Sequence, residues 1–167
     1  DQNSNANYSF YKDYPNIRLE FELPQMDSED IVLFGSYYAL NPALRKQVGG
    51  FLKHAKESGA LLYYDLNFRA NHKDEVESLY NTFYENFCLA DIVRGSDEDF
   101  NILYGETDIR KIYDRHIKGR CNILIMTHGA DGVEIIDRGN YYKIPSKKIE
   151  NVVSTIGAGD NFNAGIA

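Results

Sequence analysis

Residues 31–35, Ile31-Val32-Leu33-Phe34-Gly35, form a short apolar run that ends in glycine. A run of this kind is typical of a strand that is buried on both faces of a parallel sheet. Apolar residues then recur at helical spacing between an N-cap signal at Asn41-Pro42 and a stop signal at Gly59. The stretch therefore predicts a strand followed by a helix, which is the first part of a parallel crossover unit.

The same alternation continues towards the C-terminus. Further strands are predicted at 61–64, 92–93 and 123–126, and apolar residues mark helices within 76–87, 100–104 and 109–117. Two more strands, 133–136 and 141–144, are predicted to form a hairpin around Arg138-Gly139-Asn140. The pattern predicts an α/β fold: a mostly parallel, Rossmann-like sheet with helices on both faces. In such sheets ligands bind beyond the carboxyl ends of the strands.

Residues 1–22 follow a different pattern. Two short runs, Tyr8-Ser9-Phe10-Tyr11 and 17–21, lie on either side of a turn signal at Tyr14-Pro15-Asn16. They predict a small, half-exposed β-ribbon. The sequence is therefore divided into a β segment at 1–22 and an α/β core at 23–167.

Composition excludes several classes of protein. The net charge is −7, and no basic stripe suited to nucleic acid is present. No apolar run approaches the roughly 18 residues that span a bilayer, and the polar N-terminus has no signal-peptide core. Cys88 and Cys121 do not form a metal or disulfide pattern, so a reduced, cytoplasmic setting is expected. Because the chain does not begin with Met and ends within a predicted helix, we expect it to be truncated at both ends.

The segment Ser154-Thr155-Ile156-Gly157-Ala158-Gly159-Asp160-Asn161-Phe162 is a glycine-rich turn that leads into an amphipathic helix. The first N–H groups of a helix have no partner within it, and together with the helix dipole they favour an anion. A carboxylate at the same helix start could accept the proton of an attacking hydroxyl. The short pattern alone is also compatible with Asp160 as a simple helix cap and the glycines as parts of a tight turn.

The wider sequence resembles a known family. Thr155–Phe162 resembles the C-terminal signature of the ribokinase-like (PfkB) carbohydrate kinases, and Asp65-Leu66-Asn67-Phe68-Arg69 resembles the Asp-x-Asn-x-Arg strand end of fructokinases and 2-keto-3-deoxygluconate kinases. Asp91–Asp99 with 103–105 resembles the element that carries an Asn-x-x-Glu motif, and Met126–Val133 resembles the Thr-x-Gly-x-x-Gly nucleotide loop. The four matches occur in the family's order. They imply a ribokinase-like core at 23–167 for nucleotide binding and catalysis, and part of a small β lid at 1–22.

The resemblance also implies catalytic residues. Asp160 would be the general base, and the N–H groups of Ala158, Gly159 and Asp160 would form an anion hole that Gly157 allows a phosphate to approach. Ser154 occupies the position at which the signature often has an aspartate associated with a monovalent-cation site. Potassium activation is therefore not implied for this chain.

Nucleotide and metal binding are assigned by the same resemblance. Thr127, Gly129 and Gly132 would line the phosphates and ribose of ATP, although Thr127-His128-Gly129 is also compatible with an ordinary turn. Ser96 and Asp99 occupy the Asn-x-x-Glu positions, where Asp99 would organise Mg²⁺ through water. Ser96 is equally suited to be the N-cap of the following helix, and the two roles are compatible.

For the sugar, Arg69 and Asn67 are the candidates at the strand end, with an ordinary surface arginine as the alternative reading of Arg69. Tyr11 and Lys12 lie where related kinases have a lid strand that contacts sugar.

The expected activity is ATP-dependent phosphorylation of a sugar or sugar-acid hydroxyl, nearest to the fructokinase and 2-keto-3-deoxygluconate kinase branch. The alternative is a non-catalytic sugar- or nucleotide-binding sensor or assembly protein built on the same fold. We expect the 167-residue chain to be inactive by itself. A homodimer formed through the lid is implied for the complete protein, and neither nucleic acid nor membrane is an expected partner.

Overall fold

The computed structural model describes residues 21–149, 152 and 154–167. They belong to two compact units: residues 19–146 form the larger, and residues 147–167 form the smaller together with residues 1–18. Tyr11, Lys12 and the predicted β-ribbon up to residue 20 lie outside the described residues. The division at residue 22 therefore stays a prediction.

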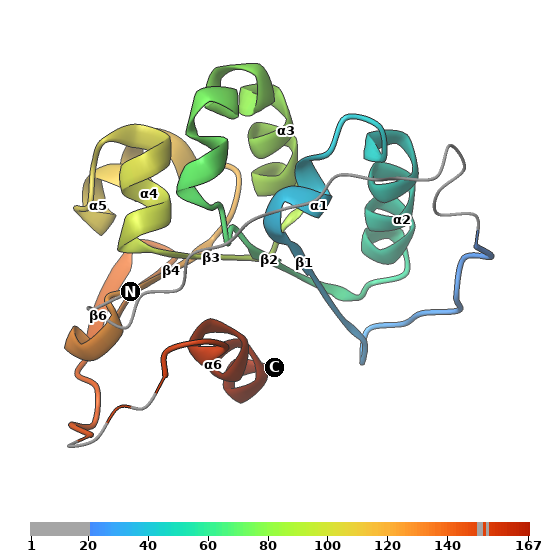
Figure 1. Ribbon diagram of the computed structural model, residues 1–167. Coiled ribbons are helices and arrows are strands. Elements are labelled where there is room, and N and C mark those ends of the chain that lie inside the picture. The colour runs from blue at the N-terminus through green and yellow to red at the C-terminus, as the bar shows by residue number, and fades with distance from the viewer. Residues whose placement is uncertain (1–20, 150–151, 153) are drawn as a thin grey trace. The chain divides into compact units, whose positions relative to one another are not determined.

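The larger unit is built on a six-stranded sheet with strand order β1-β2-β3-β4-β5-β6 (Figure 1). The first four strands pair in parallel: β1 (Ile31–Gly35), β2 (Leu61–Asp65), β3 (Ile92–Ser96) and β4 (Ile123–Thr127). The last two, β5 (Val133–Asp137) and β6 (Asn140–Ile144), pair antiparallel. Arg138 and Gly139, with φ of 48° and 87°, form their two-residue turn, as the hairpin prediction requires.

Helices follow the parallel strands. They are α1 (Ser36–Leu40), α2 (Arg45–Glu57), α3 (Val76–Leu89), α4 (Asp97–Tyr104) and α5 (Ile109–Ile112), which continues as a π-helical turn at Tyr113–Ile117. Figure 1 shows α1 to α5 on the same face of the sheet. Right-handed crossovers between successive neighbouring strands place every helix on one face, so the strand order accounts for this arrangement. The smaller unit contains α6 (Ala158–Ile166).

The start of α2 differs from the prediction. The helix begins at Arg45 rather than at Pro42, because Leu44 N–H donates to the Asn41 carbonyl at 3.0 Å and Arg45 N–H donates to the Pro42 carbonyl at 3.4 Å. These bonds make tight turns in place of a first helical turn. The predicted stop is confirmed: Gly59 has φ of 88° and its N–H donates to the Lys56 carbonyl at 3.1 Å.

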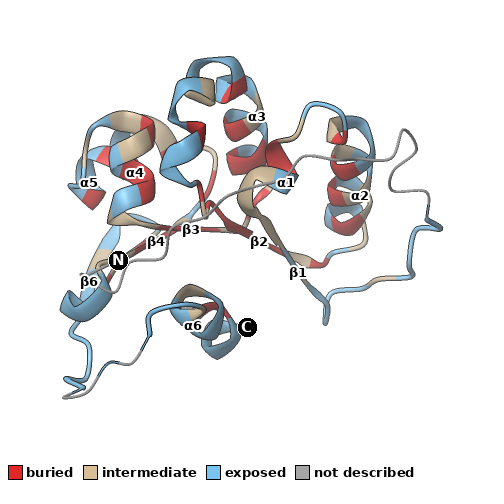
Figure 2. Cartoon of the chain, viewed as in Figure 1, coloured by how far each residue is buried: buried red, intermediate tan, exposed pale blue. Residues whose placement is uncertain are grey.

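The prediction that residues 31–34 are buried on both faces is wrong. Ile31 is 44% exposed and Leu33 is 52% exposed, whereas Phe34 packs against the core. Figure 2 shows β1 in the colours of intermediate and exposed residues. The reason is that Val32 and Phe34 pack towards the helix layer, so that Ile31 and Leu33, which alternate with them, point to the face opposite α1 to α5.

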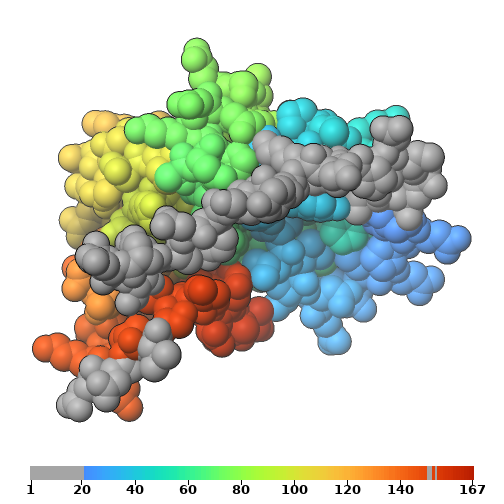
Figure 3. Space-filling model, in the orientation of Figure 1, coloured from blue at the N-terminus to red at the C-terminus, as the bar shows by residue number. Residues whose placement is uncertain are grey.

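The main core lies between the sheet and helices α1, α3, α4 and α5, and a second cluster of buried residues lies between α2 and the sheet. The strand residues of the main core are fully buried; they include Tyr64, Val93 and Leu124. Gly95 in β3 makes room for the helix layer, because a Cβ there would lie 2.8 Å from the side chains of both Leu66 and Phe100. The glycine thus allows α4 to pack closely on the strand that precedes it. Figure 3 shows α3 and α4, the green and yellow segments, next to each other at the surface.

No helix in the described ranges is long and apolar enough to cross a lipid bilayer.

Candidate active site

The carboxyl ends of β1 to β4 meet at one edge of the sheet, because the four strands are parallel. Gly35 is in register with Asp65, and Ser96 is in register with Thr127. Residues that are far apart in the sequence are thereby brought to one edge, as ligand sites of parallel sheets require. The predicted site residues of the larger unit lie at this edge, in the loops that follow it or, for Asp99, in the first turn of α4.

A buried guanidinium links three strands at this edge. Arg94 of β3 donates from one terminal nitrogen to Asp65 Oδ1 of β2 at 2.9 Å, and from the other to Thr127 Oγ1 of β4 at 2.9 Å. The side chains of Arg94 and Asp65 are only 8% and 9% exposed. Burial also raises the pKa of the adjacent Tyr63 hydroxyl to about 12, against the opposing effect of the Arg94 charge.

Arg94 was not among the predicted site residues, although the sequence contains a signal for it. Arg94 stands in a strand between Val93 and Gly95, both of which are buried, and a charged side chain in such a place needs a polar partner. The polar partner is Asp65, the only acidic residue of the neighbouring strand β2.

Ser96 caps α4, as one of its two predicted roles requires. Its hydroxyl accepts from Asp99 N–H at 3.1 Å and donates to Asp99 Oδ2 at 2.8 Å, while Ser96 N–H donates to the same oxygen at 2.7 Å. Ser96 and Asp99 thus form a reciprocal capping box. The nucleotide-binding role of Ser96 stays a prediction.

Asp99 also holds the loop that follows β2. Its Oδ1 accepts from Phe68 N–H at 2.7 Å, so the buried carboxylate accepts three hydrogen bonds in all. Burial raises the pKa of Asp99, and the hydrogen bonds from Ser96 and Phe68 oppose that rise. Asp99 therefore connects the start of α4 to the segment that carries Asn67 and Arg69.

Asn67 and Arg69 lie in that segment. Asn67 has φ of 36°, in the left-handed region that asparagine tolerates better than most residues. Arg69 is exposed, whereas the intervening Phe68 is only 1% exposed and anchors the loop to the core. The loop therefore presents Arg69 on a fixed backbone. Contact of either residue with a sugar stays a prediction.

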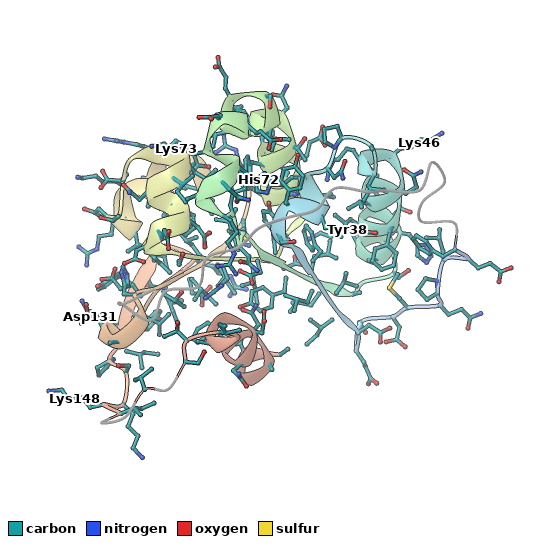
Figure 4. All side chains as sticks on the ribbon, viewed as in Figure 1. Tyr38, Lys46, His72, Lys73, Asp131 and Lys148 are labelled. Carbon is teal, nitrogen blue, oxygen red and sulfur yellow. The ribbon has the colours of Figure 1, made fainter. Side chains whose placement is uncertain are left out.

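A second anchor follows Arg69. His72 in the 3₁₀ turn Ala70–Glu75 is buried and its Nδ1 lies 2.8 Å from Glu75 Oε1. Tyr37 of α1 donates to Glu75 Oε2 at 2.6 Å and stacks on the His72 ring at a centroid distance of 3.9 Å. Figure 4 shows His72 directed inward and Lys73 projecting outward. The buried group ties the loop to α1 and so limits its motion.

The predicted nucleotide loop follows β4. Its chain turns back where His128 N–H donates to the Gly132 carbonyl at 2.9 Å, and Asp131 is exposed in the short 3₁₀ turn Gly129–Asp131 (Figure 4). Gly129 and Gly132 have φ of 55° and 98°. A Cβ at Gly129 would meet nothing within 4 Å, but a Cβ at Gly132 would lie 2.2 Å from the Ile144 carbonyl oxygen. The two glycines therefore have different structural roles.

His128 joins this loop to its neighbours. Its Nε2 lies 2.9 Å from Glu134 Oε2 of β5, and its Nδ1 lies 3.4 Å from Asp97 Oδ2 of α4. Burial disfavours the charged form of Glu134, but hydrogen bonds from Tyr141 and His128 outweigh that effect and hold the pKa of Glu134 below its ordinary value. The imidazole thus fixes the start of the loop between two elements.

The C-terminal signature forms the start of α6 in the smaller unit. Gly157 is the N-cap with φ of 75°, and Asp160 is exposed in the first helical turn. The Ala158 N–H donates to the Thr155 carbonyl at 3.1 Å, while the N–H groups of Gly159 and Asp160 have no partner within the helix. Of the three amides predicted for the anion hole, the last two thus lack a helical acceptor.

In the described part of the chain, no three His, Cys, Asp or Glu side chains gather as a metal site. Mg²⁺ commonly keeps several waters and uses few protein carboxylates. A carboxylate has about four acceptor positions, and Asp99 uses three of them. The remaining capacity fits an outer-sphere contact through a metal-bound water.

Comparison with known proteins shows the family of this chain. The model of the pfkB family carbohydrate kinases matches residues 3–167. The chain belongs to this family. It is 27% identical over 177 residues to probable fructokinase-6, chloroplastic, from Arabidopsis thaliana, which covers 95% of the chain and 43% of that protein. It is 23% identical to 2-dehydro-3-deoxygluconokinase from Dickeya dadantii, covering 99% of the chain and 57% of that protein.

Solved structures give the same fold. Aminoimidazole riboside kinase from Salmonella enterica, complexed with aminoimidazole riboside and an ATP analogue, superposes with a TM-score of 0.72 at 26% identity, over 86% of this chain and 48% of that chain. Fructokinase from Vibrio cholerae O395, with fructose, ADP and calcium ion bound, superposes with a TM-score of 0.72 at 25% identity, over 86% of this chain and 46% of that chain. The pfkB chain described here spans about half the length of these relatives. The predicted family and the predicted mostly parallel, ribokinase-like fold are confirmed. The prediction of helices on both faces is not matched in the larger unit, where α1 to α5 lie on one face because successive neighbouring strands are joined by crossovers of one hand.

Proposed function

We propose that the intact protein transfers the γ-phosphoryl group of ATP to a hydroxyl of a sugar or sugar acid. One observation carries the proposal: an exposed carboxylate, Asp160, stands in the first turn of α6, three residues after the left-handed N-cap Gly157, in a chain of the pfkB family. The same short segment thus offers a proton acceptor and amides suited to an anion.

The chemical step requires little from the protein beyond positioning, a proton acceptor and charge stabilisation. Asp160 takes the proton of the sugar hydroxyl, and the hydroxyl oxygen forms a bond to the γ-phosphorus. The bond between that phosphorus and the β–γ bridging oxygen breaks, and ADP leaves with the electron pair. The amides of Gly159 and Asp160, with Ala158 if its bond to Thr155 is released or shared, donate to the transferring group.

On the nucleotide side, the loop after β4 would hold ATP. Thr127 offers a hydroxyl at the strand end, Gly129 leaves open space beside the backbone, and Gly132 sets the turn. Asp99 would hold Mg²⁺ through water, with Ser96 beside it. When bound, Mg²⁺ would neutralise phosphate charge and orient the phosphate groups.

The proposed sugar contacts are Asn67 and Arg69, together with Tyr11 and Lys12 in a β lid at residues 1–22. A guanidinium offers several N–H donors to hydroxyl or carboxylate oxygens, which suits a ketose or a sugar acid. Relatives named fructokinase and 2-dehydro-3-deoxygluconokinase support this branch. We further propose a cytoplasmic protein, a homodimer formed through the lid, and no activity for the 167-residue chain alone.

The test is an ADP-release screen of the intact protein against fructose, ribose, 2-keto-3-deoxygluconate and adenosine. ADP release that depends on fructose or on 2-keto-3-deoxygluconate is expected. Turnover of adenosine alone would reverse the branch assignment, and the absence of ATP use with every acceptor would reject the kinase proposal.

A second candidate is a non-catalytic protein that binds sugar or nucleotide. It is favoured by Ser154, whose hydroxyl accepts from Ile156 N–H at 3.1 Å in a local turn, where the family signature often has an aspartate. Binding of an ATP analogue by calorimetry without ADP release from any acceptor would support this candidate over the kinase.

A further inference from the structure

Arg94 bridges two neighbouring strands: it pairs with Asp65 of β2 and also donates to Thr127 of β4, a second contact that an ordinary ion pair does not need. Arg94 lies opposite Asp65 in the register of β2 and β3, while Thr127 lies two residues beyond Ile125, the register partner of Arg94 in β4. The three side chains therefore project from the same face of the sheet. The planar guanidinium spans them with one terminal nitrogen on each neighbour, both at 2.9 Å.

This contact fixes the role of the Thr127 hydroxyl. A guanidinium has only donors, so Thr127 Oγ1 must accept from Arg94, and its single proton is left to donate elsewhere. Thr127 is held at its backbone by register pairs with Ser96 and Val133, and it is partly exposed. No acceptor for its proton is found among residues 21–149, 152 and 154–167. The hydroxyl is therefore an oriented donor, polarised by a neighbouring positive charge.

Asp65 completes the arrangement. By pairing with Arg94 at 2.9 Å it fixes the guanidinium in place and compensates its charge in a buried site. Stability alone would not require the contact with Thr127, since a buried ion pair contributes little net stability compared with an apolar replacement. The additional hydrogen bond from Arg94 to Thr127 is what orients the Thr127 hydroxyl.

We propose that Arg94 is a positioning residue that orients the Thr127 hydroxyl as a hydrogen-bond donor to a phosphate oxygen of ATP. This inference rests on the proposed function, because it assumes that the loop after β4 holds the nucleotide. Arg94 acts through Thr127 and does not itself contact the nucleotide.

The test combines variants of the intact protein in a double-mutant cycle. Thr127→Val removes the hydroxyl at nearly constant shape. Arg94→Gln combined with Asp65→Asn removes both charges together, so that no unpaired buried charge is left behind. The readouts are KM for ATP, KM for sugar and kcat from ADP release, together with the Kd of a non-hydrolysable ATP analogue from calorimetry.

Each change is expected to raise KM for ATP and the analogue Kd by roughly tenfold, the effect of one charge-assisted hydrogen bond. KM for sugar and kcat should change less than about threefold, because binding is lost equally in the ground and transition states. When Thr127→Val is already present, the Arg94 and Asp65 changes should raise KM for ATP and the analogue Kd by less than about a further twofold. Thr127→Ser should restore ATP affinity.

Two results would overturn the positioning role while the kinase proposal stands. Unchanged KM for ATP in a folded Arg94 variant would make the bridge purely structural. Multiplicative effects of the Arg94 and Thr127 changes would mean that Arg94 acts independently of the hydroxyl. A wild type that neither binds the analogue nor releases ADP would instead reject the proposed function and this inference with it.

If the paired variant does not fold, Arg94→Lys replaces it in the same cycle, because a lysine retains the charge but cannot span both partners as a planar fork. Arg45→Lys is the matched control. Arg45 makes a comparable bridge to Glu85 and Asn86, at 2.8 Å each, on the helix layer. That variant should leave KM for ATP unchanged.

Discussion

Substitution of Gly132 should destabilise the protein through the junction between the loop after β4 and the end of β6. An alanine Cβ would lie 2.2 Å from the Ile144 carbonyl oxygen, 2.7 Å from Ser146 N and 2.9 Å from Pro145 C. All three are backbone atoms, so the strand end must move, at a cost of about 1–3 kcal/mol. The φ of 98° adds about 1–2 kcal/mol for a residue with a side chain. Gly132→Ala should therefore lower the free energy of unfolding by about 2–5 kcal/mol.

The assay is urea unfolding, with Gly139→Ala as the matched control. Gly139 has φ of 87°, but a Cβ there would meet nothing within 4 Å, so only the backbone cost of about 1–2 kcal/mol applies. Gly129→Ala should behave like the control in unfolding, because its surroundings are equally open. Equal stability losses for Gly132→Ala and Gly139→Ala would refute the argument from backbone overlap.

Three further predictions concern single side chains. Ser96→Ala should lose about 1 kcal/mol of unfolding free energy in urea, because the capping box of α4 is broken; Ser96→Thr should retain most of it, and no loss in the alanine variant would contradict the cap's contribution. Glu134→Gln should lower the free energy of unfolding above about pH 4.3, the ordinary pKa of glutamate. The pKa of Glu134 is lowered in the folded state, so its ionised carboxylate stabilises that state above the ordinary pKa. The contribution is lost as the pH falls through the lowered pKa, so the difference between the variant and the wild type should disappear there. Unfolding from pH 3 to 7 checks this against Glu57→Gln, an exposed control, and a difference independent of pH would speak against it. Gly50→Ala in α2 should raise the melting temperature and add about 1 kcal/mol to the free energy of unfolding, because alanine has the higher helix propensity and its Cβ would meet nothing within 4 Å. A lower melting temperature would contradict the helix-propensity argument.

The strands were predictable because their apolar runs are short, separated and bounded by turn residues. The hairpin at 138–139 followed from its turn chemistry in the same way. The helix start at Arg45 was not predictable, since the tight turns at Asn41 and Pro42 compete locally with an N-cap that has similar residues. The exposure of Leu33 depends on strand order, which the spacing of apolar residues does not encode.

The candidate site was predictable as far as short motifs reach. Thr127 ends β4, Gly129 and Gly132 lie in the loop that follows it, and Ser96 caps α4, as the sequence indicated. The capping alternative for Ser96 is confirmed, while its role towards a nucleotide is a proposal. The need of Arg94 for a polar partner could be inferred from its place in a buried strand, but its bridge to both Asp65 and Thr127 could not, because pairing across three strands depends on register rather than on spacing along the chain.

The same limit applies to Asp99. Its acidic side chain was predictable as a motif residue, but its hydrogen bond from Phe68 joins segments that are 31 residues apart. A sequence pattern identifies such a carboxylate without showing how many of its acceptor positions are already used by the protein.

The central claim is that the carboxylate of Asp160 deprotonates the acceptor hydroxyl, and Asp160→Asn in the intact protein tests it most directly. ADP release with the preferred sugar should fall by about 10²–10⁴-fold in kcat, while the Kd of an ATP analogue stays within about threefold. An asparagine variant that retains wild-type kcat would contradict the account.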